Sequence, residues 1–183
     1  MKLGAYLLLA AAPMWAQVAR TAAVRIDPGG PQQAVRIAQG TFTDLEKRFN
    51  ARLERLFDAN DPLDLLGNTR GVYLEGYGAV FTVELSLVRT PTLLPFRTTI
   101  SKELAESVRA KKIQRLPALK AAMKEMLHNM AATFIQIPYD QRVVLIARFY
   151  YEPWENLSGM PSQVLMRATR KGSMAGEIEV EEQ

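Results

Sequence analysis

A stretch of strict alternation between apolar and polar residues constrains the fold of this 183-residue chain more than any other feature. In residues 79–88, AVFTVELSLV, every second side chain is apolar, and Thr82, Glu84 and Ser86 stand between them. A period of two predicts a β-strand with one buried face and one polar face. The apolar set is Phe81, Val83, Leu85 and Leu87. Because a one-residue slip would turn this set to solvent, the preceding segment must fix the register.

That preceding segment, residues 72–78 (VYLEGYG), combines a short β-prone run with two glycines that flank Tyr77. Glycine reaches positive φ without steric cost, as a tight turn or a bulge requires. The pattern therefore predicts a β-hairpin in which residues 72–75 pair with the start of the longer strand.

Three helices are predicted around this hairpin. In residues 41–61, Thr43 and Glu46 have the spacing of a capping box, and Asp61-Pro62 marks the end. Two more helices are expected at 101–112, capped by Ser101, and from Pro117 to about residue 135, because proline suits a first helical position. The last helix carries an apolar stripe that predicts core packing. Its members are Leu119, Met123, Met126, Leu127, Met130 and Phe134.

Two strands are predicted after the helices, and together these elements indicate the fold class. Residues 143–147 are all apolar, which is typical of a buried strand, and residues 162–170 suggest another. We expect an α+β fold with a largely antiparallel sheet of about four strands packed on two to three helices, in the order helix-β-β-helix-helix-β-β. Residues 42–183 would form this single domain, and residues 17–41 a flexible leader. The sequence leaves open whether the acidic tail adds a short final strand.

The first sixteen residues have the layout of a secretory signal peptide. Lys2 precedes a mostly apolar run of ten residues, Pro13 ends it, and Ala16 offers a cleavage point. We therefore expect a periplasmic or secreted protein. Later segments do not approach the roughly 20 apolar residues of a transmembrane helix, so no stable membrane insertion is expected after cleavage. The absence of cysteine excludes disulfides and thiol chemistry, and it favours a bacterial source.

The positive charge of the chain is concentrated in residues 97–124. Eight basic residues there face three acidic ones when the adjacent Glu125 is counted, a balance of +5, while the net charge of the whole chain is +4. Such a segment is either a basic patch for anionic partners or a solvated helix face. Because no aromatic residue interrupts residues 99–128, a stacking platform for nucleic acid is missing. We therefore expect no nucleic-acid partner.

Few residues suggest catalysis. The single histidine, His128, lies off the apolar stripe, and the sequence contains no metal-ligand spacing, phosphate loop or nucleophile elbow. We expect no metal and no cofactor. Glu75 beside the glycine turn and Glu84 on the polar strand face are the remaining candidates, since two carboxylates are the minimum for acid–base hydrolysis. Otherwise Glu75 is an exposed turn residue, and Glu84 pairs with Arg142 or Arg148.

Aromatic side chains give the second set of candidates. Tyr151 and Trp154 lie in a predicted loop, and Tyr73 and Tyr77 belong to the hairpin. Aromatic groups at a sheet edge are typical of surfaces that bind glycans, peptides or proteins, although they also close the ends of cores. The sequence favours an exported, non-enzymatic binding or envelope-associated domain with these four residues as binding candidates. The alternative is a hydrolase that uses Glu75 and Glu84.

Overall fold

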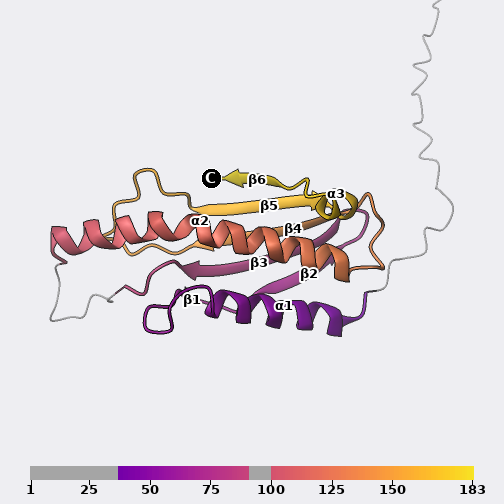
Figure 1. Cartoon of the computed structure of the whole chain (residues 1–183), viewed down its shortest axis with the longest axis horizontal. Helices are drawn as coiled ribbons and strands as arrows, with labels where there is room; N and C mark the ends of the chain where they lie inside the picture. The colour runs from indigo at the N-terminus through magenta and orange to yellow at the C-terminus, as the bar shows by residue number, and fades with distance from the viewer. Residues whose placement is uncertain (1–36, 91–99) are drawn as a thin grey trace, which may run out of the picture. The chain divides into compact units, whose positions relative to one another are not determined.

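The computed structural model describes residues 37–90 and 100–183, so the expected signal peptide and most of the expected leader lie outside the described residues. The described chain has an α+β fold with three helices and six strands (Figure 1). Their order is α1 (Gln39–Glu54), β1 (Asp64–Leu65), β2 (Arg70–Leu74), β3 (Gly78–Ser86), α2 (Lys102–Thr133), β4 (Arg142–Phe149), β5 (Gln163–Thr169), α3 (Arg170–Met174) and β6 (Glu179–Glu182). The predicted α+β class with a mostly antiparallel sheet is confirmed, but the sheet has six strands rather than about four, and β1, β6 and α3 are additions to the predicted order.

The six strands form one mixed sheet. Its order is β1-β3-β4-β5-β6, and β2 also pairs with β3. β1 pairs with the last residues of β3 and β2 with the first, so these two short strands share one edge. All pairs are antiparallel except β3 and β4, which are parallel because α2 forms the crossover connection between them.

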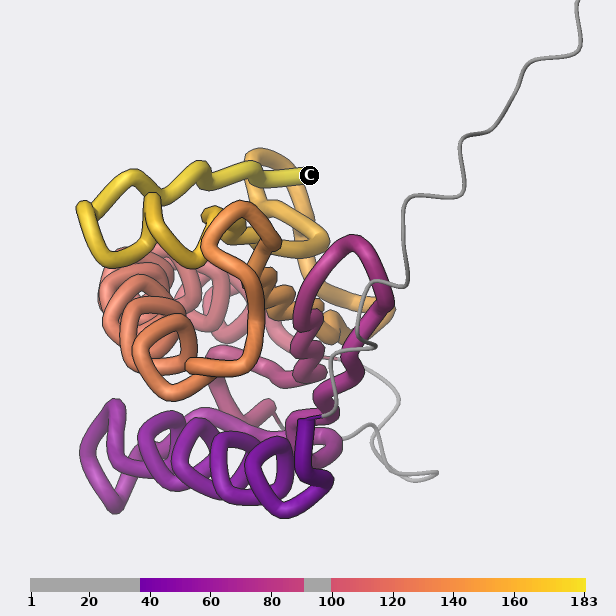
Figure 2. The backbone as a smooth tube through the Cα atoms, turned by 90° about the vertical axis from the view of Figure 1, so that its right-hand side faces the viewer, coloured from indigo at the N-terminus to yellow at the C-terminus, as the bar shows by residue number. Residues whose placement is uncertain are grey.

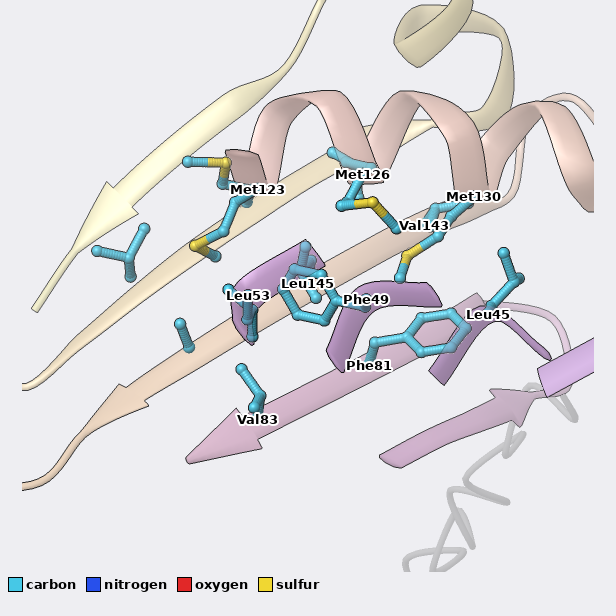
Figure 3. Close-up of a cluster of buried hydrophobic side chains, with 14 of the residues drawn as sticks. Leu45, Phe49, Leu53, Phe81, Val83, Met123, Met126, Met130, Val143 and Leu145 are labelled. Atoms are coloured by element: carbon cyan, nitrogen blue, oxygen red, sulfur yellow. The ribbon is translucent and has the colours of Figure 1, made fainter. Parts of the chain in front are cut away.

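The two long helices lie on one face of the sheet, in front of the strands in Figure 1 and along the left and lower sides of the molecule in Figure 2. Alternate residues of β3, β4 and β5 are buried beneath them, as the sequence alternation predicted for β3. Figure 3 shows Met123, Met126 and Met130 of α2 above these strands, and all three are at most 5% exposed. The predicted core role of the α2 stripe is therefore confirmed. We call this side of the sheet the covered face.

The predicted hairpin is also confirmed, and both of its glycines have positive φ. β2 pairs with β3 so that Leu74 lies opposite Gly78, and the Tyr77 N–H donates to the Leu74 carbonyl at 3.0 Å. Gly76 has φ 74° and Gly78 has φ 134°. A Cβ on Gly78 would also overlap the main-chain oxygen of Arg142 on the parallel strand β4. Gly78 is thus required both for backbone conformation and for close strand approach.

The prediction of two separate helices at 101–112 and 117–135 was wrong, because α2 continues through Pro117. The Ser101 cap is present, with its hydroxyl oxygen accepting from the Leu104 N–H at 3.2 Å. Proline removes one helical hydrogen bond, to the carbonyl of residue 113. Both Pro117 and Ile113 are exposed, so this freed carbonyl lies on the solvent side of the helix, where water can bind it.

The capping box predicted for the first helix is also absent. α1 begins at Gln39 and ends at Glu54, so it starts and stops earlier than expected. The Thr43 hydroxyl donates to the Gln39 carbonyl within the helix at 3.3 Å. Glu46 instead accepts a hydrogen bond from the Gly71 N–H at 2.8 Å, which ties α1 to β2. Among the described residues, no helix is both long enough and apolar enough to cross a membrane.

Candidate functional site

The side of the sheet opposite the helices carries an apolar centre with a charged rim. The strand register places its side chains in rows that run across the sheet. One row is Val72, Val80, Val144, Arg167 and Glu179, and the next is Arg70, Thr82, Ile146, Leu165 and Glu181. We call this side the open face. Its central strands contribute valine, isoleucine and leucine, the β6 edge contributes Glu179 and Glu181, and the β2 edge contributes Arg70 beside the apolar Val72 and Leu74.

Exposure on the open face rises toward the edge strand β2. Val144 on the central strand is only 3% exposed, whereas Val72 is 51% and Leu74 is 46% exposed. An apolar centre inside a charged rim is the usual anatomy of a protein–protein interface. Side chains that alternate with the core residues of the same strands thus supply an accessible apolar surface.

The predicted aromatic residues Tyr73 and Tyr77 lie at the turn end of this sheet, on different sides. Tyr77 is 38% exposed, and its ring centroid lies 5.7 Å from the guanidinium of Arg142, an open-face residue. Tyr73 points to the covered side, where its hydroxyl forms a 2.9 Å hydrogen bond with Gln141. Tyr77 therefore borders the open face, and Tyr73 packs at the edge of the core.

Tyr151 and Trp154 lie beyond the other end of β4, a strand of eight residues or roughly 26 Å. The Tyr151 hydroxyl donates to the Pro161 carbonyl at 2.6 Å, and burial, followed by the charge of Glu155, raises the pKa of Tyr151 to about 12. The indole N–H of Trp154 is buried without a hydrogen-bond acceptor among the described residues. The four predicted aromatic residues therefore form two separate groups rather than one patch.

The loop that carries Tyr151 and Trp154 is held by a buried ion pair. Lys112 Nζ lies 2.7 Å and 2.8 Å from the two carboxylate oxygens of Glu155, and both side chains are less than 5% exposed. The same ammonium lies 4.7 Å from the ring centroid of Tyr151. Glu155 also accepts from the Glu152 N–H at 2.9 Å. This arrangement satisfies both charges and fastens the loop to α2, which is a structural role.

Other cations of the basic segment are also used inside the fold. Lys111 and Arg115 both pair with Asp61, and the hydrogen bond from Lys111 lowers the pKa of that carboxyl group. Arg109 donates to the Ser158 carbonyl at 2.6 Å, and Lys120 pairs with Glu182 of β6 at 2.6 Å. These contacts hold loops and an edge strand to α2. Because Lys112 and Arg115 are buried in such contacts, this segment is not simply the solvated helix face that the sequence suggested.

The two carboxylates proposed for hydrolysis are not brought together. Glu75 lies in the exposed turn, whereas Glu84 lies six residues past Gly78 on β3, opposite Arg148 of β4. At about 3.3 Å per residue this separation is roughly 20 Å. Carboxylate pairs of glycosidases lie about 5 to 10 Å apart, so Glu75 and Glu84 do not form such a pair in this arrangement.

The single histidine and the remaining acidic residues suggest no metal centre. His128 is exposed, and its Nδ1 lies 3.0 Å from the Ser173 carbonyl oxygen, a contact between α2 and α3. Within residues 37–90 and 100–183, no three His, Asp or Glu side chains are grouped closely enough to hold a metal ion.

Two open grooves flank α1, and sequence reasoning identified neither. One, of about 600 Å³, lies between α1 and α2, and its lining includes Arg48, Arg52 and Arg55. The other, of about 330 Å³, lies between α1 and the start of β2, and its lining includes Glu46, Asn50 and Arg70. Both combine residues far apart in the chain, so no local sequence pattern could have indicated them.

Comparison with protein-family models, with curated proteins and with solved structures finds no match to this chain. Functional inference therefore rests on the geometry of the open face and its edges.

Proposed function

We propose that this chain is an exported, non-enzymatic binding domain that recognises another protein through the open face of its sheet. The observation that supports this proposal is the half-exposed apolar pair Val72 and Leu74 on β2, of which Val72 continues the apolar row of Val80 on β3 and Val144 on β4. Burying such side chains against a partner is favourable because it removes apolar surface from water.

The shape and charge of the open face favour a protein over other partners. Small molecules bind in concave pockets, whereas this surface is a sheet face, of which only Arg70 also lines one of the two grooves that flank α1. The rim mixes Arg70, Arg142 and Arg148 with Glu84, Glu179 and Glu181. A mixed rim gives no net attraction for a membrane or a nucleic acid, but it can pair with a mixed rim on a protein partner.

The experiment that tests this proposal compares three forms of the tagged protein in its native host. Partners that co-purify with the wild type would be quantified by mass spectrometry and compared with those of Ile146→Lys and Ile113→Lys. Ile146 lies on the open face, and Ile113 is an equally apolar, 43% exposed control on α2. We expect a partner that is lost only with Ile146→Lys. A partner that both variants retain, or that only Ile113→Lys loses, would contradict an open-face role.

Export is part of the proposal and is supported by the signal-like arrangement of Lys2, the apolar run and Ala16. Cleavage after Ala16 would leave a mature chain that begins at Gln17. Intact mass of protein from the periplasm or the medium should match this shortened chain. Recovery of only the full-length chain from the cytoplasm would argue against export.

A further inference from the structure

The groove of about 600 Å³ between α1 and α2 has no role in the proposed function, because no open-face residue lines it. The two helices that form it lie side by side over the sheet (Figure 1). Three arginines of α1 line the groove, namely Arg48, Arg52 and Arg55. Their spacing of four and then three residues places them on one side of the helix. We call this site the arginine groove.

The positive charge of the arginine groove is only partly balanced within the fold. Arg52 forms a 3.0 Å ion pair with Glu125 of α2. Arg48 and Arg55 form no ion pair and no side-chain hydrogen bond with any described residue, and Asp44, one turn before Arg48, is not paired with it. The described residues that line the groove include no carboxylate. The groove therefore presents two guanidinium groups that an anion can bind.

The base of the arginine groove is apolar. Leu45 and Met126 line it although they are only 1% and 5% exposed, so they lie at its bottom, and both belong to the core cluster of Figure 3. Ala51 on α1 and Ala132 on α2 have short side chains, which leave the space between the helices open. The α2 wall adds Asn129, whose amide has no partner among the described residues. Cationic and apolar groups thus line one groove.

The size of the arginine groove favours a small ligand. Its lining spans residues 45–55 of α1, roughly 15 Å at 1.5 Å per residue, and packed helices lie about 8 to 10 Å apart. The resulting patch, on the order of 150 Å², is far below the roughly 800 Å² per partner of a stable protein interface. The volume is within the roughly 300 to 1,000 Å³ of small-molecule sites.

The segments of this chain outside the described residues do not complement the arginine groove. Residues 1–36 contain four basic residues and one aspartate, and residues 91–99 contain one arginine and no acidic residue. The acidic C-terminal segment is already paired in the sheet, as β6 beside β5. An anion from outside the chain is therefore the occupant that the charge of the groove favours.

We propose that the arginine groove binds a small single-chain amphiphile with an anionic head, of which a fatty acid is the simplest example. The guanidinium groups of Arg48 and Arg55 would bind the head, because arginine pairs with carboxylates through two parallel hydrogen bonds. The apolar chain would lie over Leu45 and Met126, where its burial removes apolar surface from water. This inference goes beyond the proposed function, since the groove and the open face share no residue.

The first test is an NMR titration of the purified protein with decanoate, followed through the backbone amide signals. We expect saturable shifts centred on residues 45–55 and 126–133. Decyltrimethylammonium has the same tail with a cationic head, and acetate has the same head without the tail, so both should cause much smaller shifts. Equal binding of either control, shifts confined to other residues, or no shift with decanoate would overturn the proposal. Binding of a polyglutamate peptide without binding of decanoate would also overturn it.

The second test removes the cations one at a time. Arg48→Gln and Arg55→Gln should each raise the Kd for decanoate about three- to five-fold, the effect of losing one partly exposed ion pair. Lys47→Gln is the matched control, because Lys47 lies on the same helix and loses the same charge but lines the other groove. Its Kd should be unchanged. Equal Kd values for the lysine and arginine variants would overturn the role of the arginines and with it the proposal.

The third test places a negative charge inside the groove. Ala132→Glu should weaken decanoate binding more than ten-fold, because its carboxylate would repel the head and occupy the space of the chain. Ala110→Glu, an exposed position elsewhere on α2, makes the same change outside the groove and should leave the Kd unaltered. Both alanines are exposed, so both variants should fold, and thermal unfolding would check this. Equal affinities of these two variants would overturn binding in the arginine groove.

Discussion

The covered and open faces of the sheet are built from alternate residues of the same strands, yet they have different physical roles. On β4, Leu145 is fully buried beneath the helices, whereas its neighbour Ile146 lies on the open face. On β2, the ring of Tyr73 packs against the core, whereas Val72 is half exposed. This difference indicates that burial of side chains on the covered face supplies most of the free energy of folding. Exposed open-face residues such as Val72 can therefore vary with a partner at small cost to stability.

The largest expected effect comes from adjacent residues on opposite faces of β3. Phe81 is fully buried, and its ring lies 5.6 Å from that of Phe42 and 5.8 Å from that of Phe134. Phe81→Ala should lower the free energy of unfolding by about 3 to 5 kcal/mol. Thr82→Ala, on the exposed face, should change it by less than about 0.5 kcal/mol. Urea titration of both variants measures this difference in the free energy of unfolding. Similar losses in the two variants would contradict the distinction between the covered and open faces.

The hairpin glycines give the next largest effect. Gly76→Ala meets no neighbouring atoms but keeps a strained positive φ, so it should cost about 1 kcal/mol. Gly78→Ala should cost more, about 2 to 3 kcal/mol, because its Cβ would also overlap Arg142 of β4. Glu75→Gln, in the exposed turn, should be nearly neutral. Equal stability of the two glycine variants in urea would contradict the close approach of β3 and β4.

A smaller effect tests how well the covered face is closed at its far end, where Tyr151 packs against Phe149. The pKa of Tyr151 is about 12 in the folded chain against an ordinary value of 10.0, so the folded state binds this proton more tightly. The resulting stabilisation is complete below pH 10 and is lost as the pH rises from 10 to 12. Unfolding free energies should therefore fall more steeply over this range in the wild type than in Tyr151→Phe. Parallel pH profiles would mean that Tyr151 is solvated.

Local periodicity in the sequence correctly predicted the strand and the helix that form the core on the covered face. The alternation from Phe81 to Leu87 and the stripe from Leu119 to Phe134 were both found in the core. The Ser101 cap signal was correct, whereas the proline signal failed at Pro117, where the helix continues with its freed carbonyl in solvent, and the capping-box signal failed because Glu46 bonds to Gly71 of β2.

The functional surface was less accessible to sequence reasoning because it combines distant segments. The ion pair of Lys112 with Glu155 joins residues 43 positions apart, and the open-face rows join strands from β2 to β6. Sequence reasoning placed weight on Tyr73, Tyr77, Tyr151 and Trp154, which the fold separates into two groups. It could not single out Val72 or Ile146, because an apolar residue in a strand does not reveal which face the helices cover.

The most direct test of recognition through the open face is site-specific photo-crosslinking in intact cells. A photoreactive phenylalanine derivative would replace Ile146 on the open face, Val72 at its edge, or Ile113 on α2, one position at a time. All three lie outside the covered core, so the protein should fold in each case. We expect the same crosslinked partner from positions 146 and 72 and none from position 113. Adducts at position 113 alone, or no adduct at either open-face position, would contradict recognition through this face.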